Sequence, residues 1–172
     1  MAIYALGDVE PRIHPDAYIH PDATVIGDVT IGPGSSVWPQ AVLRGDYGVI
    51  TVGARTSVQD GAVLHTTPRH PTVVGDDVVI GHLAHLECCT VRNGSLIGTG
   101  SIVLHEAVVE AGALVGAGAV VPNGMIVPTG AMALGVPAKL RLDSVDVAET
   151  MRNAAEYVKN GARYRLELRR VD

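Results

Sequence analysis

Aliphatic residues recur at every sixth position through the C-terminal half of the chain. The longest unbroken series contains Val91, Ile97, Val103, Val109, Val115, Val121 and Val127. A period of six matches neither the 3.6-residue period of an α-helix nor the two-residue period of an ordinary strand. It is typical of a repeat architecture, in which short units of the same shape stack on one another.

Small residues fill the spaces between these aliphatics. Segments 97–101 (IGTGS) and 115–120 (VGAGAV) consist of Gly, Ala, Ser and Thr around one or two branched residues. Glycine tolerates the positive φ that a tight corner needs. The pattern therefore predicts short strands that each turn one side chain inward, with three hexads completing one triangular coil.

The same period extends toward the N-terminus in three shorter series. They are Ile13, Ile19, Val25, Ile31, Val37 and Leu43, then Val52, Val58 and Leu64, then Val74, Ile80 and Leu86. Long gaps separate them at 43–52 and 64–74, and one short step lies at 86–91. We expect loops to project from the coil at the two long gaps.

The period changes to steps of three and four after Pro137. The apolar positions there are Val147, Met151, Ala154, Ala155, Val158 and Ala162. This spacing predicts an amphipathic helix, and Asp143 and Ser144 are suitable residues for its start. The chain thus divides into a β-helix domain, 1–138, and a tail, 139–172, whose helix is expected to pack on the prism or at a subunit interface.

Composition fits a single domain of this kind. The chain has 172 residues, of which 47% are hydrophobic but only 3% aromatic, and it lacks Phe. A prism filled by Val, Ile and Leu needs no large rings. Cys88 and Cys89 are neighbours, so they cannot link distant segments, and we interpret them as two small residues of a coil.

Charge and hydropathy exclude several partners. Residues 1–138 carry 12 acidic side chains against 5 basic ones, which argues against nucleic acid. The first residues, MAIYALGDVEPR, do not read as an export signal, and no apolar run reaches the ~20 residues of a membrane span. We expect a cytoplasmic protein without a membrane partner.

The hexads also place polar residues relative to one another. If residues 66–73 loop out, Leu64 and Leu86 stack on the same face in successive coils, about 4.8 Å apart. The residues that follow them, His65 and Glu87, then lie side by side on the outer surface, close enough to share a metal ion. By the same count Val58 stacks on Ile80, which puts Asp60 level with His82 on another face. Only His82 of a second subunit could then join His65 and Glu87.

Several motifs together resemble a known family. They are RGD at 44–46, QDG at 59–61 followed by LH at 64–65, GH at 81–82, and LGVPAK at 134–139 before the expected helix. The hexads at 10–135 resemble the left-handed parallel β-helix of hexapeptide-repeat proteins, and the motifs resemble the gamma-class carbonic anhydrases among them. The resemblance implies an all-β solenoid with a C-terminal α-helix. It also implies a homotrimer that binds one metal ion at each subunit interface through three histidines, two from one subunit and one from the next.

The positions that match the family's ligands are His65, His82 and Glu87. The implied metal is Zn²⁺ or Fe²⁺, and the implied reaction is reversible hydration of CO₂ to bicarbonate by metal-bound hydroxide. A carboxylate in the third position lowers the net charge of the site, so the pKa of bound water should fall less, or no metal is bound at all. His85 also points outward and is a substitute ligand, whereas His105 lies beyond the level of the ligands and reads as structural.

Further site residues follow from the resemblance one by one. Arg44 and Asp46 match a salt bridge across the trimer contact. Gln59 matches a residue that orients the bound hydroxide, and Asp60 one that pairs with Arg44. Tyr157 matches a tyrosine that reaches the site from the C-terminal helix, although an ordinary helix tyrosine would look the same.

Two other functions remain compatible with the sequence. One is a hexapeptide acyltransferase that uses an acyl-CoA donor, with His105 or His65 as general base and no metal. Such enzymes usually carry longer insertion loops than the gaps seen here. The other is a non-catalytic scaffold subunit that keeps the trimer. If the chain is an active carbonic anhydrase, it is a lyase.

Overall fold

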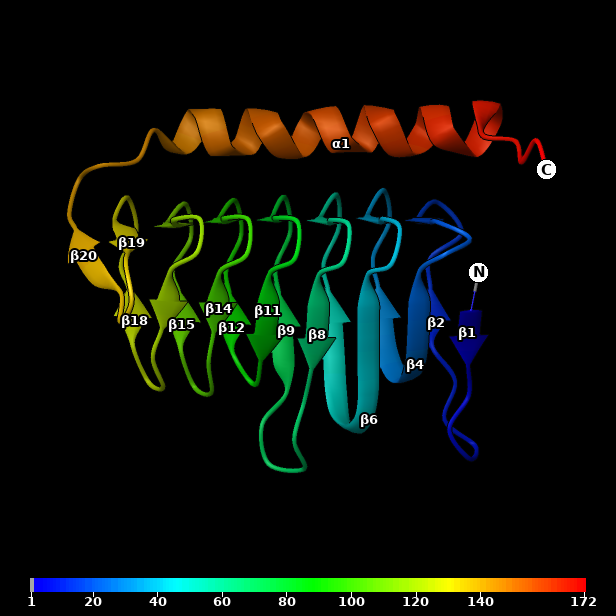
Figure 1. Cartoon of the computed structure of the whole chain (residues 1–172), viewed down its shortest axis with the longest axis horizontal. Coiled ribbons are helices and arrows are strands. Elements are labelled where there is room, and N and C mark those ends of the chain that lie inside the picture. Colours follow the sequence, from blue (N-terminus) through cyan, green and yellow to red (C-terminus); the bar gives the residue numbers. More distant parts are fainter. Residues whose placement is uncertain (1) are drawn as a thin grey trace.

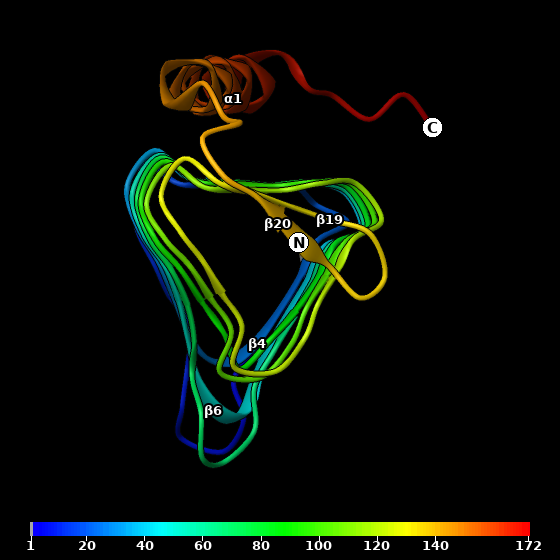
Figure 2. The same ribbon diagram turned by 90° about the vertical axis from the view of Figure 1, so that its left-hand side faces the viewer.

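The structure is a computed structural model that describes residues 2–172, apart from the side chain of Met151. Short parallel strands wind into a prism with a triangular cross-section, and one long helix runs along its length (Figures 1 and 2). The all-β solenoid predicted from the hexads, a left-handed parallel β-helix with a C-terminal α-helix, is confirmed.

We name the three faces of the prism A, B and C. A 12-stranded sheet covers faces A and B, and an 8-stranded sheet forms face C. Face A contains β1 (Ala2–Tyr4), the first halves of β4 (Thr24–Ile31) and β6 (Val42–Val52), β8 (Val63–His65), β11 (His85–Glu87), β14 (Ile102–Val103) and β17 (Val120–Val121). Face B contains β2 (Arg12–Ile13), the second halves of β4 and β6, β9 (Thr72–Val74), β12 (Thr90–Val91), β15 (Val108–Val109) and β18 (Ile126–Val127).

Face C is the third face of the prism, and the C-terminal helix packs on it. Its strands are β3 (Tyr18–Ile19), β5 (Ser36–Val37), β7 (Ser57–Val58), β10 (Val79–Ile80), β13 (Leu96–Ile97), β16 (Leu114–Val115), β19 (Met132–Leu134) and β20 (Lys139–Arg141). Every described pair of strands within the two sheets is parallel except the last, in which β20 turns back against β19.

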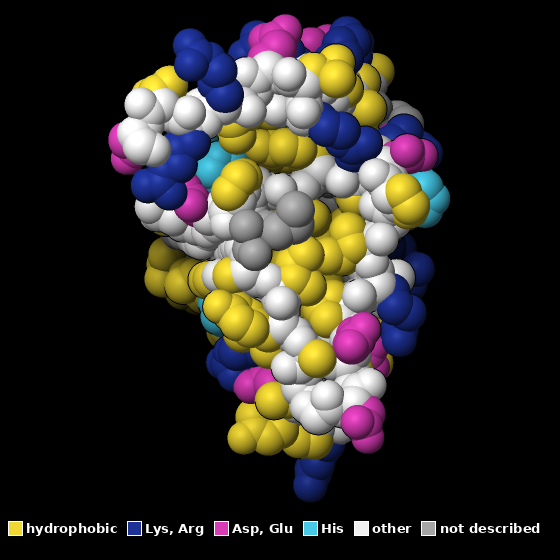
Figure 3. Space-filling model, turned by 90° about the vertical axis from the view of Figure 1, so that its right-hand side faces the viewer, with side chains coloured by type: hydrophobic (Ala, Val, Ile, Leu, Met, Phe, Trp, Pro, Cys, Tyr) yellow, Lys and Arg dark blue, Asp and Glu magenta, His cyan; other side chains and the backbone are white. Residues whose placement is uncertain are grey.

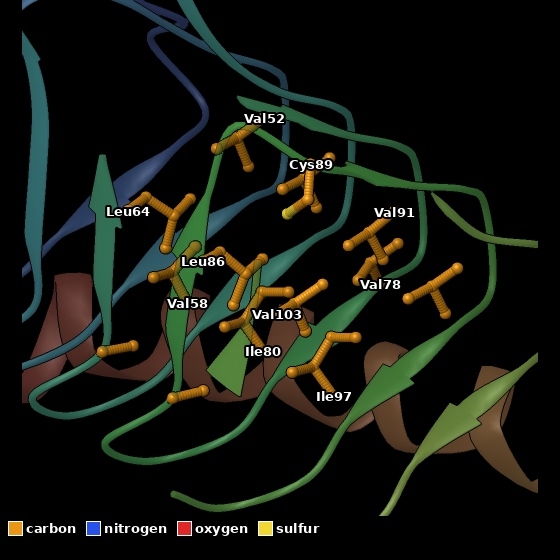
Figure 4. Packing of buried hydrophobic residues seen from close by; sticks show 14 of the residues in the cluster. Val52, Val58, Leu64, Val78, Ile80, Leu86, Cys89, Val91, Ile97 and Val103 are labelled. Atoms are coloured by element: carbon orange, nitrogen blue, oxygen red, sulfur yellow. The ribbon is translucent and has the colours of Figure 1, made fainter. Parts of the chain in front are cut away.

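The core consists of columns of hexad side chains. Leu64, Leu86 and Val103 stack in one column, and their side chains have no exposed surface (Figure 4). Alanines two positions before an inward aliphatic, such as Ala107 and Ala113, are also fully buried. The stacking expected from the period is therefore confirmed, and the column holds the residues beside it at fixed heights along the prism.

Corners between strands need a left-handed residue. Glycine fills this position six residues apart at Gly94, Gly100, Gly112, Gly118, Gly124 and Gly130. Glu106 occupies the same position with φ 61°, and Cys88 does so with φ 54°. Cys89 follows that corner and is buried like the alanines, so the two cysteines are small residues of a coil, as expected.

Both long gaps produce projections from the prism, as expected. The loop 66–71 projects along the lower edge of the prism in Figure 1. Segment 43–52 projects as the bend of β6, which extends beyond the triangular outline in Figure 2. The two ends of β6 pair with β4 on faces A and B, whereas residues 46–49 have no partner in β4, because β4 has only Asp28 between Gly27 and Val29.

Helix α1 (Val147–Glu167) lies over face C. Its N-cap is Asp146, whose carboxylate accepts hydrogen bonds from the backbone of Ala148 and Glu149, so the expected start at Asp143 or Ser144 is wrong. Asp146 is the N-cap because its side chain accepts hydrogen bonds from the free backbone N–H groups of the first turn. No helix among the described residues is long and apolar enough to cross a bilayer.

The buried stripe of α1 differs from the expected one. Thr150, Ala154 and Gly161 are buried, whereas Ala155 and Ala162 are exposed, and the side chain of Met151 lies outside the described part. A Cβ at Gly161 would lie 3.3 Å from the Tyr18 Cβ, so the helix approaches the coil through its smallest residue. The closest approach is made by small residues, and the aromatic rings of Tyr157 and Tyr164 pack against Trp38 on the same face.

The N-terminal end of the prism exposes hydrophobic side chains. Ile3, Tyr4, Leu6 and Val9 are each at least 40% exposed. Figure 3 views the molecule from this end and shows hydrophobic side chains gathered across it.

Removing a column residue should destabilise the coil. Leu86 is fully buried, and Leu86→Ala is expected to lower the free energy of unfolding by about 2–5 kcal/mol, because it leaves a cavity in a packed column. Leu166→Ala, at a side chain 85% exposed, should change it by less than about 0.5 kcal/mol. Urea unfolding followed by circular dichroism measures both, and equal effects would contradict the packing described.

Candidate metal centre

The centre of interest is a pair of side chains on face A. Strands β8 and β11 pair in register, with His65 opposite Glu87. The His65 Nδ1 lies 3.3 Å from the Glu87 Oε1. The neighbours predicted from the hexads are therefore found side by side, and both are partly buried.

Two further imidazoles reach the same carboxylate. The His85 Nε2 lies 3.3 Å from the Glu87 Oε2, and the His105 Nε2 lies 3.6 Å from the Glu87 Oε1. The interpretation of His105 as remote from the ligand level is wrong. Val103 stacks directly on Leu86, so His105 lies only two residues beyond the column that holds Glu87 in place. The hexad spacing alone could therefore have predicted this proximity.

An acidic residue from β6 approaches His65 from the other side. The His65 Nε2 lies 3.1 Å from the Asp46 Oδ1, and the Arg44 guanidinium donates a hydrogen bond to the other oxygen of Asp46. Within one chain the expected pairing of Asp60 with Arg44 is not formed, because Arg44 pairs with Asp46 of the same chain and Asp60 faces His82.

His65 thus has a carboxylate oxygen at each ring nitrogen. A neutral imidazole carries a single N–H, so it can donate only one of these two hydrogen bonds. The second carboxylate is satisfied by a protonated ring or by a cation that binds the free nitrogen and an oxygen together. Imidazole nitrogen and carboxylate oxygen are both ordinary ligands of Zn²⁺, so this donor set fits a divalent ion.

The carboxylates are held in their ionised form. Partial burial raises the pKa of Glu87, but hydrogen bonds from His85 and His65 outweigh this and hold the pKa below its usual range. Burial likewise raises the pKa of Asp46, and hydrogen bonds from Arg44 and His65 more than offset it. The site therefore presents two negative charges at neutral pH.

The remaining candidate residues lie at the corner between faces C and A. The His82 Nδ1 is 2.9 Å from the Asp60 Oδ2. Gln59, His82 and Tyr157 line a groove of about 330 Å³ between the coil and α1. Gln59 is 4% exposed, and none of the described hydrogen bonds uses its amide. Tyr157 also packs edge-on against Trp38, as an ordinary helix tyrosine would.

The candidate residues thus form two separate groups. One chain holds His65 and Glu87 near one edge of face A, and His82 with Gln59 near the other. Within the described residues, no three His, Cys, Asp or Glu side chains are already arranged to hold a metal ion. His82 is therefore absent from the pair within one chain, as the stacking count predicted.

Comparisons with known proteins agree with this architecture. A family model described as "Bacterial transferase hexapeptide (six repeats)" matches residues 10–45. A carbonic anhydrase of Geobacillus kaustophilus is 41% identical over 95% of this chain and 91% of its own. Gamma carbonic anhydrase 1, a mitochondrial protein of Arabidopsis thaliana, is 39% identical over 56% of this chain and 38% of its own. Among solved structures, a hexapeptide transferase family protein from Anaplasma phagocytophilum superposes with a TM-score of 0.91 at 36% identity, covering 95% of this chain and 98% of its own.

Glu87 should stabilise the fold in a pH-dependent way. Its pKa is lower in the folded chain than in the unfolded one, so its contribution is present above the unfolded value and is lost as the pH falls through the folded value. We expect Glu87→Gln, measured with a chelator present, to lower the urea midpoint at pH 7, and the difference from wild type to shrink toward pH 3.

The matched control is Glu106→Gln. Glu106 faces a single imidazole, His70, and its side chain is 63% exposed. This variant should unfold like wild type at both pH values. A Glu87→Gln difference that grows as the pH falls would contradict the ionised carboxylate.

Proposed function

The chain belongs to the gamma-class carbonic-anhydrase-like hexapeptide-repeat proteins, and on this premise we propose that it is a homotrimeric metalloprotein that hydrates CO₂ reversibly at its subunit interfaces. Its likeness to the Geobacillus kaustophilus carbonic anhydrase covers nearly the full length of both chains. We place the protein in the cytoplasm, with CO₂ and bicarbonate as substrates and without nucleic-acid or membrane partners.

The single observation that carries this proposal is the division of the donors between two edges of face A. His65 and Glu87 stack on adjacent coils, whereas His82 lies at another corner and faces Asp60. If the edge of the prism that carries His82 in one copy packs against face A of another copy, that His82 approaches the His65–Glu87 pair. The metal, Zn²⁺ or Fe²⁺, then has His65 and Glu87 from one subunit and His82 of the partner subunit as ligands.

Exposed apolar side chains beside both groups support an interface there. Leu83 follows His82 directly and is 68% exposed, and Tyr47 follows Asp46 and is 65% exposed. Large apolar residues at the centre of a contact are the usual source of its stability. A subunit contact that covers them would bury the two groups of donors together.

In this proposal each polar residue has one task. An ion bound by these residues would lower the pKa of a water and so provide hydroxide for attack on CO₂. Arg44 holds Asp46, and Asp46 in turn fixes the ring of His65. Asp60 orients the ring of His82 through its Nδ1. Gln59 offers an unused amide to a substrate oxygen, and Tyr157 walls the groove from the side of the helix.

Glu87 sets the expected rate. A carboxylate ligand reduces the net charge of the site by one, so the ion acidifies its water less than an ion held by imidazoles alone. We therefore expect slower hydration at neutral pH than a three-histidine site would give, with a steeper rise toward alkaline pH.

An acyltransferase is the second candidate. A candidate acetyltransferase of Bacillus cereus superposes with a TM-score of 0.91 at 38% identity, covering 95% of this chain and 96% of its own. This function needs no metal and uses an acyl-CoA donor, with His105 or His65 as the base. A scaffold subunit without turnover would likewise keep the trimer alone. Metal binding separates both from the proposed function.

We expect about one metal ion per chain in protein purified without chelator. His82→Ala and Glu87→Ala should each lose the ion in competition with a chelator, because each removes a ligand, and CO₂ hydration in a stopped-flow assay should fall with it. His14→Ala changes an imidazole on the first coil that faces only Asp16, so it is the matched control and should retain both.

Two results would count against the proposal. Wild-type protein that binds neither zinc nor anaerobic ferrous iron favours the acyltransferase or scaffold. A stable monomer by light scattering removes the interface on which the site depends.

A further inference from the structure

The Glu87 carboxylate is surrounded by more imidazoles than the proposed site uses. His65 comes from the coil before Glu87, His85 from the same strand, and His105 from the corner after β14 in the next coil. All three ring nitrogens lie within 3.6 Å of a Glu87 oxygen. One of them, His65, is already a ligand in the proposed function.

The contacts separate His105 from His85. His65 and His105 approach the same oxygen, Oε1, at 3.3 and 3.6 Å, whereas His85 approaches Oε2. In a four-coordinate zinc site with bonds of about 2.0–2.1 Å, neighbouring donor atoms lie about 3.3 Å apart. The two distances to the Glu87 Oε1 are close to the edge length of such a tetrahedron, and the two edges share the Oε1 as a common corner.

Accessibility permits the necessary ring movement. The His105 side chain is 38% exposed, and those of His65 and Glu87 are 16% and 23% exposed. The three donors are thus accessible to solvent, and none of them is locked in the packed core. Because they are not yet arranged around one point, a bound ion must draw the rings together.

The backbone repeats one feature beside three of the candidate ligands, though not beside His65. His82, Glu87 and His105 each directly precede a non-glycine residue with positive φ, namely Leu83, Cys88 and Glu106. Between residues 80 and 130 all other left-handed positions are glycines. Such strained residues cluster at functional sites, so this pattern supports His105 alongside the other two.

We propose that His105 is a further ligand of the same metal ion, so that one subunit supplies His65, Glu87 and His105 and the partner subunit supplies His82. This inference rests on the proposed function for the ion and its interface. It restores three imidazoles to a site in which Glu87 occupies the place of one.

The additional ligand changes what the ion can do. Four protein donors fill a tetrahedral site, and such closed sites are typical of structural zinc, whereas catalytic zinc keeps a position for water. With four protein ligands an ion bound here would leave little room for water, so it would hold the subunits together firmly and support only slow CO₂ hydration.

X-ray absorption of the zinc-loaded full chain tests this by counting imidazoles. We expect three in wild type and two in His105→Ala, with a matching change in the visible absorption of the Co²⁺-loaded protein. His105→Ala should also weaken Co²⁺ binding by at least about 10-fold. Circular dichroism and light scattering establish that each variant keeps its fold and assembly.

His85→Ala is the matched control, because it removes an imidazole that contacts the same carboxylate through the other oxygen. It should leave the imidazole count at three. A count of two in wild type that His105→Ala does not change would overturn the inference and leave the proposed function intact. A count that falls in His85→Ala instead would overturn it as well. Wild type that binds no metal overturns both.

Discussion

Backbone hydrogen bonding between successive coils is the constraint on which the rest of the structure depends. Each strand pairs in register with the strand one coil before and one coil after it, so a residue has fixed neighbours along the prism. The buried column keeps this register, because a slip of one residue would turn an aliphatic outward and a polar residue inward. Position in the hexad therefore decides both burial and neighbourhood.

This constraint explains how distant residues form a site. His65 and Glu87 are far apart in the chain yet occupy adjacent rungs, because Leu64 and Leu86 share a column. The insertion at 66–71 leaves the coil without disturbing the rungs on either side. The same rule keeps His82 away from the pair within one chain, which is why the proposed site takes His82 from a second subunit.

Most of the architecture, and the adjacency of His65 and Glu87, could be predicted from the six-residue period alone. The columns, the adjacency of His65 and Glu87, and the separation of His82 are properties of backbone register, which a count of residues can predict. The pairing of Asp46 with His65 depends on the course of the projecting bend of β6, which a count of residues does not predict. The inner face of α1 depends on the close approach at Gly161, which hydrophobicity does not reveal.

The central claim is that one ion is shared between subunits, and mixing two inactive variants tests it most directly. His65→Ala and His82→Ala each break every interface of their own homotrimer. A mixed trimer, unfolded and refolded together, contains interfaces in which one subunit supplies His65 and its neighbour supplies His82. We predict that chelator-resistant metal returns only in the mixture. No recovery on mixing, or full metal retention by either variant alone, would contradict an interfacial site.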